Sequence, residues 1–162
     1  MGRDFEEFYR STFPSMVVLA VAVTAQRAGA EDIVQDAMVD AHRRWDRIAG
    51  YDSPRAWVRR VVVQRSMKAL RKRSNELDAA RRSVRGEVEP PDAGIDPLLR
   101  QALLELPDQQ RAVIALHYLE DMSVADTARA LGISDGSVKT QLARGRSRLS
   151  QLLGTEGAEL HD

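Results

Sequence analysis

The sequence has 162 residues, of which 43% are hydrophobic, 5% aromatic and 30% charged, and it contains no cysteine. Its 24 basic and 24 acidic residues give a formal net charge of +0. This composition is typical of a soluble chain with one ordinary domain or two small ones. The lack of cysteine excludes disulfides, thiolate metal sites and cysteine nucleophiles, and the neutral net charge would ordinarily disfavour a nucleic-acid binder.

The net charge is a sum of unlike segments. Residues 1–75 carry 14 basic and 9 acidic residues, residues 76–110 carry 4 and 8, and residues 111–162 carry 6 and 7. Two stretches, 55–73 and 136–155, contain bases without any acid. We therefore predict two cationic helices, for which a polyanion is a natural partner.

Residues 1–75 are predicted to form the first of two small helical domains. The apolar run Met16–Val23 is shorter than the roughly 20 residues of a membrane span, so it predicts a buried helix. The N-terminus is acidic rather than cationic, which argues against a secretory signal and favours a cytoplasmic protein without a membrane partner. No segment alternates like a strand, so the expected fold class is all-α, with three or four helices in this part.

The segment Glu31–Ile48 is predicted to be an amphipathic helix. Its apolar residues fall on one side of a helical wheel, and Asp32, Gln35 and Asp36 fall on the other. Val39 lies among these polar residues. An apolar residue in an acidic face indicates either a protein partner or a solvated face with one stray valine, and the wheel alone favours the second interpretation.

A cationic helix is predicted to begin at Pro54, with Ser53 as its capping residue. Its bases repel one another by about 0.2–0.5 kcal/mol for each adjacent like-charged pair. A bound nucleic acid would relieve that repulsion, and we favour this reading. The alternative is a solvated helix that covers the core with its arginine stems.

Residues 76–97 are predicted to be an acidic, flexible linker, because acids, glycines and prolines replace the apolar periodicity there. The first part of this segment could still extend the preceding helix. Residues 98–154 are expected to form the second helical domain, and residues 155–162 a disordered tail.

The second domain is predicted to contain a helix-turn-helix. Ser123 would cap its first helix, Gly132 suits the tight turn, and Ser134 would cap a recognition helix over Asp135–Leu152. The start of that helix would enter the major groove. The candidate base contacts are Gly136, Ser137, Lys139, Thr140, Gln141 and Arg144, whereas Arg146 and Arg148 suit phosphates. A helical hairpin with a basic last helix is the alternative.

Four motifs, at residues 5–9, 30–37, 106–111 and 136–146, resemble those of the extracytoplasmic-function (group 4) sigma factors of bacterial RNA polymerase, in the sigma-70 family. The resemblance covers nearly the whole chain. It implies sigma domain 2 in residues 1–75 and sigma domain 4 in residues 98–154. The expected partners are core polymerase (the beta prime clamp helices and the beta subunit), promoter DNA and an anti-sigma protein.

The resemblance also assigns roles to residues. Asp32, Gln35, Asp36 and Val39 would dock on the clamp helices, which reverses the preference for a solvated face. The second domain would read the -35 duplex, and the cationic helix would hold the separated non-template strand of the -10 element. The -10 contacts implied are Tyr51, Asp52, Ser53, Trp57, Arg60, Gln64, Lys68, Arg71 and Lys72.

Three of these assignments carry a qualification. For Trp57, simple core packing is an equal alternative. Gln64 and Lys68 stand where the family usually has an asparagine and an acid, so the preferred -10 bases are expected to differ while the mode of action is kept.

Two other functional classes make different predictions. A dimeric helix-turn-helix regulator with a ligand-sensing front domain would bind its operator without polymerase. An enzyme is disfavoured, because His42, His117 and His161 are scattered and no paired-acid site emerges. We therefore predict no catalytic residue, no metal site and no cofactor.

Overall fold

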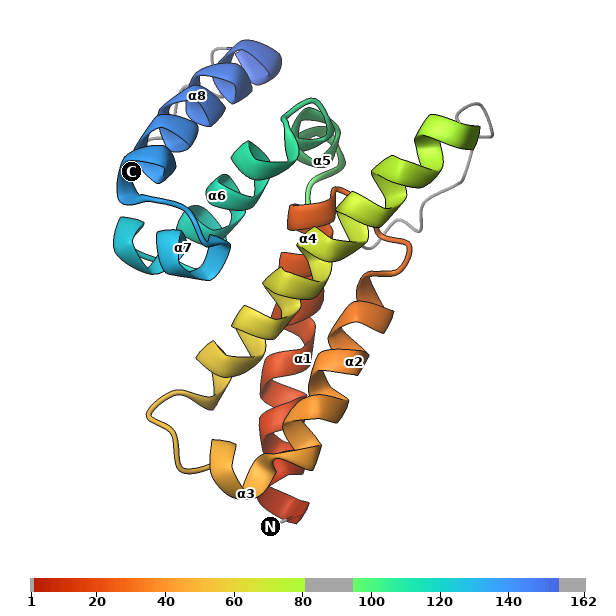
Figure 1. The fold of residues 1–162 in the computed structure, drawn as a ribbon, viewed down its shortest axis with the longest axis vertical. Coiled ribbons are helices and arrows are strands. Elements are labelled where there is room, and N and C mark those ends of the chain that lie inside the picture. Colours follow the sequence, from red (N-terminus) through yellow and green to blue (C-terminus); the bar gives the residue numbers. More distant parts are fainter. Residues whose placement is uncertain (1, 81–94, 155–162) are drawn as a thin grey trace.

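The computed structural model describes residues 2–80 and 95–154, and all regular structure within these ranges is helical (Figure 1). This agrees with the expected all-α class. The central part of the predicted linker, residues 81–94, and the predicted disordered tail, residues 155–162, lie outside the described residues.

The first domain is built from four helices. They are α1 (Gly2–Thr24), α2 (Ala30–Arg43), α3 (Trp45–Ile48) and α4 (Pro54–Ala80). α1, α2 and α4 lie side by side, and α2 runs antiparallel to the other two (Figure 1). α3 is a single turn at the same end of the bundle as the N-terminus (Figure 1).

Local sequence explains where α2 and α4 begin. Gly29 precedes α2 with a φ of 85°, a left-handed conformation that glycine adopts without steric cost. The Ser53 hydroxyl accepts the amide of Ala56 at 3.0 Å, so Ser53 caps α4 as predicted. Because α4 continues to Ala80, the first residues assigned to the linker are helical.

The second domain also has four helices, and its last two form the predicted helix-turn-helix. Ser123 accepts the amide of Asp126 and Ser134 accepts the amide of Ser137, both at 3.0 Å. Between them Gly132 is left-handed, with a φ of 71°. The helices are α5 (Pro97–Leu104), α6 (Asp108–Leu119), α7 (Val124–Leu131) and α8 (Asp135–Leu153).

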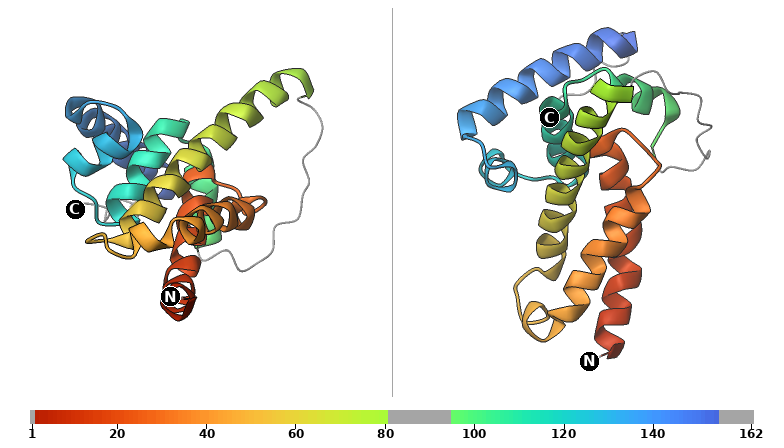
Figure 2. Two further views of the ribbon diagram at one scale, coloured as in Figure 1. Left: turned by 60° about the horizontal axis from the view of Figure 1, so that its bottom comes forward. Right: turned by 45° about the vertical axis from the view of Figure 1, so that its right-hand side comes forward.

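The two domains are packed against each other. α6 lies against α1, and α7 lies against α4 (Figures 1 and 2). Ala112, Ala115, Leu116 and Met122 of the second domain are buried in the same apolar cluster as the core of the first domain. A separate cluster, between α5, α6, α7 and α8, holds the second domain together. We call this packed arrangement the closed form.

Two arginines of the second domain cap the end of α1. Arg111 donates from Nε to the carbonyl of Val23 at 2.7 Å, and Arg100 donates from Nη1 to the carbonyl of Ala25 at 2.9 Å. The last carbonyls of a helix have no partner within the helix and carry partial negative charge. The closed form thus satisfies backbone groups of the first domain with side chains of the second.

Candidate polymerase and DNA interfaces

The candidate polymerase-docking residues lie together on one exposed face of α2. Asp32, Gln35, Asp36 and Val39 are all exposed, and their spacing of three, one and three residues places them on one side of a helix. Val39 exposes 45% of its surface. The opposite side of α2, including Val34, Ala37, Met38 and Ala41, is buried in the core, as the helical wheel predicts. We call the four exposed residues the docking face.

The docking face is tied to its neighbours by polar contacts. Tyr9 of α1 donates its hydroxyl to Oε1 of Gln35 at 3.2 Å. Arg65 of α4 lies 3.8 Å from Asp36 and forms a shorter ion pair, 2.7 Å, with Asp40. Through Arg65, the helix that carries the docking face is joined by ion pairs to the cationic helix α4.

The cationic helix is partly neutralised by acids that are distant in sequence. Arg55 and Arg59 form ion pairs with Glu120, and Arg65 pairs with Asp40. In the described residues, no ion pair forms at the remaining exposed bases, which are Arg60, Lys68, Arg71 and Lys72. The expectation of an unrelieved cationic helix therefore holds for only part of it, and these four bases are the ones available to a polyanion.

A pocket of about 390 Å³ lies between α2 and α4 beside Trp57. Trp57 packs against the core and also lines this pocket, so both readings of this residue describe part of its environment. Two other predicted -10 contacts, Gln64 and Lys68, line the same pocket. Its remaining lining residues are Asp40, Arg44, Val61 and Arg65.

The loop before α4 carries the remaining -10 candidates. Tyr51 exposes 43% of its surface, and Asp52 and Ser53 are also exposed. The Ser53 hydroxyl is already engaged as the helix cap, so its contribution to a base pocket would have to combine with that role. Tyr51 is outside the pocket beside Trp57, whose lining it does not join.

The predicted -35 contacts lie on α8 in three different situations. Gly136, Lys139, Thr140 and Arg144 are exposed, whereas Ser137 is half-buried at the start of the helix. Gln141 and Arg146 are held by protein partners instead. Gln141 donates to Gln109 Oε1 at 3.1 Å, and Arg146 donates from Nε to the hydroxyl of Tyr118 at 2.6 Å.

Arg146 is further fixed by its position over the Tyr118 ring, 5.9 Å from the centroid. Such a cation–π contact orients a guanidinium without using all of its donors. Lys139 and Arg144 therefore present the freest charged groups among the candidate base readers, and Arg146 is preset against α6.

Some residues at these interfaces were not singled out from the sequence. Asp40 and Glu120 neutralise the cationic helix, and Arg111 is 3% exposed although it is charged. Arg55 and Arg59 were recognised only as members of a basic run. A local pattern carries no signal for these roles, because the partners come from other helices.

The fold, with two helical domains of which the second contains a helix-turn-helix, is that of a helical DNA-binding protein. The sequence matches the family model Sigma-70 region 2 over residues 8–76 and Sigma-70, region 4 over residues 97–149. The chain belongs to the sigma-70 family, and it is an RNA polymerase sigma factor of the extracytoplasmic-function type.

The relatives it resembles carry that description. It is 32% identical to the ECF RNA polymerase sigma factor SigM of Mycobacterium tuberculosis over 93% of this chain and 77% of the relative. It is 33% identical to the RNA polymerase sigma-E factor of Streptomyces avermitilis over 93% of this chain and 85% of the relative.

Two solved structures share the fold. The sigma factor RpoE in complex with the anti-sigma factor NepR from Bartonella quintana superposes with a TM-score of 0.76 at 26% identity, covering 93% of this chain and 97% of the other. CnrH in complex with the cytosolic domain of CnrY superposes with a TM-score of 0.63 at 26% identity, covering 94% of this chain and 89% of the other.

No helix within residues 2–80 and 95–154 has the length and apolar character to cross a membrane.

Proposed function

We propose that this sigma factor binds core RNA polymerase through the docking face and brings it to promoters that α8 and α4 recognise. The observation that carries the proposal is the separation of partners on one small chain. An acidic face around an exposed valine lies on α2, whereas exposed bases lie on α4 and α8. Such a division allows protein and DNA to be bound at the same time.

In this proposal the docking face packs on the clamp helices of the beta prime subunit, and the beta subunit supplies a further contact. Val39 would enter an apolar site while Asp32 and Asp36 meet bases of the partner. Charged residues around a buried apolar anchor give an interface specificity and a fast association rate.

The two cationic helices have different proposed targets. α8 would read the -35 duplex with Lys139 and Arg144, because the start of a recognition helix enters the major groove. α4 would hold the non-template strand of the -10 element with its exposed bases, and the pocket beside Trp57 would receive an unstacked base. Single strands are typically bound by a cationic groove with an aromatic side chain for stacking.

We further propose that the protein is an initiation factor and not an enzyme, that it works in the cytoplasm, and that an anti-sigma protein regulates it. The last proposal is supported by the similar structure of the sigma factor RpoE, which is bound to the anti-sigma factor NepR. The cytoplasmic location follows from the proposed partner, since core polymerase and promoter DNA are there.

Promoter-dependent run-off transcription with sigma-free core polymerase tests the proposal. We expect transcripts from a promoter library only when the protein is added. A chain that binds duplex operators as a dimer, yet neither binds core polymerase nor yields transcripts, would instead be the stand-alone regulator.

Charge reversal on the docking face gives a sharper test. The double variant Asp32→Lys, Asp36→Lys should lower the affinity for core polymerase at least about 100-fold, because two interfacial charge pairs each contribute on the order of 1.5 kcal/mol or more. Pull-down and fluorescence titration with labelled core polymerase measure this effect. Asp46→Lys, at an exposed position of α3 outside the docking face, is the control for charge reversal as such. Equal binding by the double variant and the control would remove the docking face from the proposal.

A further inference from the structure

Glu120, the residue after α6, is an almost completely buried carboxylate, and its charged partners within residues 2–80 and 95–154 are two arginines. Its side chain is 3% exposed. Oε1 and Oε2 lie 2.6 Å and 3.1 Å from Nη1 and Nη2 of Arg55, a two-point contact, and Oε1 lies 3.3 Å from Nη1 of Arg59. Both arginines belong to α4, so this contact joins the second domain to the cationic helix of the first.

The arginines around Glu120 are held ready by their own domain. Arg55 also donates from Nη2 to the hydroxyl of Ser15 on α1, at 3.0 Å. Side chains of Arg55 and Arg59 are 39% and 21% exposed, so solvent reaches both even with Glu120 in place. Two guanidinium groups therefore converge on one carboxylate that comes from elsewhere in the chain, and the Ser15 hydroxyl orients one of them.

A paired-nitrogen contact to two oxygens is the geometry by which arginine binds either a carboxylate or a phosphate. We propose that Arg55, oriented by the Ser15 hydroxyl, and Arg59 form a binding site for a backbone phosphate of the promoter strand, and that Glu120 occupies this site in the closed form. The inference rests on the proposed function, and it adds a DNA contact and an internal competitor to it.

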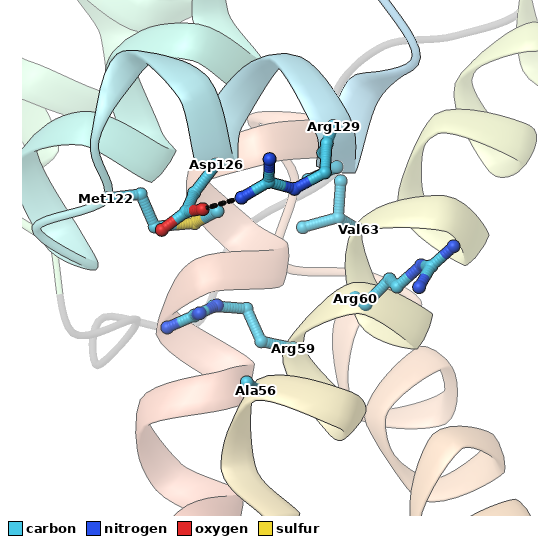
Figure 3. A pocket seen from close by; sticks show the side chains of 8 residues that line it. Ala56, Arg59, Arg60, Val63, Met122, Asp126 and Arg129 are labelled. Atoms are coloured by element: carbon cyan, nitrogen blue, oxygen red, sulfur yellow. Dashed lines mark hydrogen bonds and ion pairs between the residues drawn. The ribbon is translucent and has the colours of Figure 1, made fainter. Parts of the chain in front are cut away.

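A pocket next to this site has the charge that a strand would need. It measures about 340 Å³ and lies between α4 and α7, where Arg59 and Arg60 line it from α4, and Arg129 and Asp126 line it from α7 (Figure 3). Asp126 is paired with Arg129. Since Arg59 borders both the pocket and Glu120, a strand that enters along α4 would meet a continuous path of guanidinium groups.

The proposed exchange couples DNA binding to the separation of the domains. Glu120 lies one residue after α6 and two residues before Met122, which is buried in the shared core. A phosphate can take the place of the carboxylate only when this segment withdraws from α4. The free protein therefore binds single strands weakly, and any partner that draws the second domain away exposes the site.

Removal of the Glu120 charge tests the exchange without polymerase. The probe is a fluorescein-labelled oligothymidylate of about twelve nucleotides, whose binding to the full chain is followed by anisotropy. Glu120→Gln keeps the size of the side chain and should raise the affinity about fivefold or more, because a charged competitor is replaced by a neutral one. Asp121→Asn is the matched control, since it removes the same charge from the adjacent, exposed residue. Asp121 has a φ of 52°, which asparagine tolerates.

A second pair of variants separates the site from general charge. In the Glu120→Gln background, Arg55→Ala should return the affinity to that of the unaltered protein, whereas Arg47→Ala, at an exposed position of α3, should keep most of the gain. Circular dichroism verifies that each variant is folded. Equal gains from Glu120→Gln and Asp121→Asn, no gain from either, or an undiminished gain with Arg55→Ala would each overturn the proposal.

Binding to core polymerase is measured separately on the same variants. A chain that fails to bind core polymerase overturns the proposed function, while its response to Glu120→Gln still decides whether the phosphate site exists. A chain that binds core polymerase but shows none of the expected oligonucleotide effects overturns the phosphate site alone.

Discussion

Arg111 shows how one buried charge can be accommodated. Its Nε donates to the carbonyl of Val23 at 2.7 Å, Nη1 to the carbonyl of Leu106 at 3.0 Å, and Nη2 to Asp108 at 2.7 Å. A buried charge is tolerated when its donors are satisfied and an opposite charge is near. Burial lowers the pKa of the nearby Arg73 guanidinium, the charge of Arg111 lowers it further, and Asp108 opposes this shift. The Asp108 carboxylate therefore stabilises the positive charges of both Arg111 and Arg73.

Gly145 lies where the packing of α8 on α6 leaves no room for a side chain. A Cβ at this position would lie 2.8 Å from Cγ1 and 3.0 Å from Cδ1 of Ile114 on α6. We predict that Gly145→Ala lowers the free energy of unfolding by about 1–3 kcal/mol, because the added methyl group overpacks the contact between α8 and α6. Urea denaturation followed by circular dichroism measures the change.

Gly136→Ala provides the control for that substitution. Gly136 lies in the first turn of the same helix, and an added Cβ would come no closer than 3.9 Å to Ser134 Oγ. Alanine should therefore raise stability by up to about 1 kcal/mol through its better helix propensity. A loss of stability at Gly136 as large as that at Gly145 would show that packing on Ile114 is not the cause.

Residues with local roles could be predicted from the sequence, and residues with distant partners could not. Ser123, Gly132 and Ser134 act on their own helix ends, so their spacing was sufficient to predict the helix-turn-helix. Arg55 and Glu120 are 65 residues apart. With 24 acids and 24 bases in the chain, no spacing rule could select that pair.

At the scale of elements, the apolar run of α1 has no polar face because other helices cover α1 from more than one side. An amphipathic helix that covers one core needs only a stripe of apolar residues. α1 lies against α2 and α4 on one side and against α6 on another, so more of its circumference is buried. Six residues of the run are 2% exposed or less: Met16, Leu19, Ala20, Val21, Ala22 and Val23. Burial of the run was predictable, but the identity of the second covering surface was not.

α4 likewise carries an apolar residue whose burial is explained by the second domain. Val58 and Val62 are buried in the first domain, as expected, and Val63 is 1% exposed although it lies on another side of the helix. Val63 lines the pocket between α4 and α7 together with Ala130 of α7, and the same two residues line a neighbouring pocket of about 340 Å³ that extends to Gly132. The apolar Val63 among the bases of α4 is therefore explained by packing of the second domain. From its periodicity alone, the sequence could not show whether this residue meets another domain or a separate partner protein.

α8 is expected to separate base reading from backbone binding along its length. Arg144→Ala should change the preferred -35 sequence, with a loss of about 1–3 kcal/mol for the preferred base pair. Arg148→Ala, one turn further, should weaken all sequences alike and reduce the salt dependence by about one counterion. Selection of duplexes from a library by the assembled polymerase, at two salt concentrations, measures both effects. The same uniform loss from both variants would contradict this division.

At the scale of the whole molecule, the neutral net charge has a structural counterpart in the closed form. Asp40 of α2 and Glu120, which follows α6, form ion pairs with three bases of α4: Arg55, Arg59 and Arg65. The formal net charge of +0 is thus partly a set of specific ion pairs. Bases that are paired with acids within the protein are unavailable to a polyanion, and so we expect the closed form to bind DNA weakly.

The closed form is also too small to span a promoter. A folded chain of this length has a diameter of about 40 Å. The centres of a -35 and a -10 element are about 25 base pairs apart, or about 85 Å of duplex at 3.4 Å per base pair. If α8 reads one element while α4 holds the other, the domains have to separate. The capped end of α1, the shared core and the Glu120 contact would all be given up together.

This separation can be measured directly, because the chain has no cysteine of its own. Spin labels on Ala49→Cys beside α3 and Ser147→Cys on α8 would occupy exposed positions in different domains. We predict a single narrow distance distribution for the free protein, since apolar and polar contacts hold the closed form. Core polymerase should replace it with a longer distance, in the range that two promoter elements require. Pulsed electron resonance measures both distributions.

The same labels place Glu120 within that transition. Glu120→Gln removes one of the contacts that close the molecule, but the shared apolar core and the Arg111 contact remain. The variant should therefore broaden the distribution toward longer distances without reaching the value found with core polymerase. Asp121→Asn should leave the distribution narrow, because Asp121 is exposed and makes no interdomain ion pair in the described residues. An unchanged distance after addition of core polymerase would mean that the closed form itself binds, and that the separation of the domains is not part of initiation.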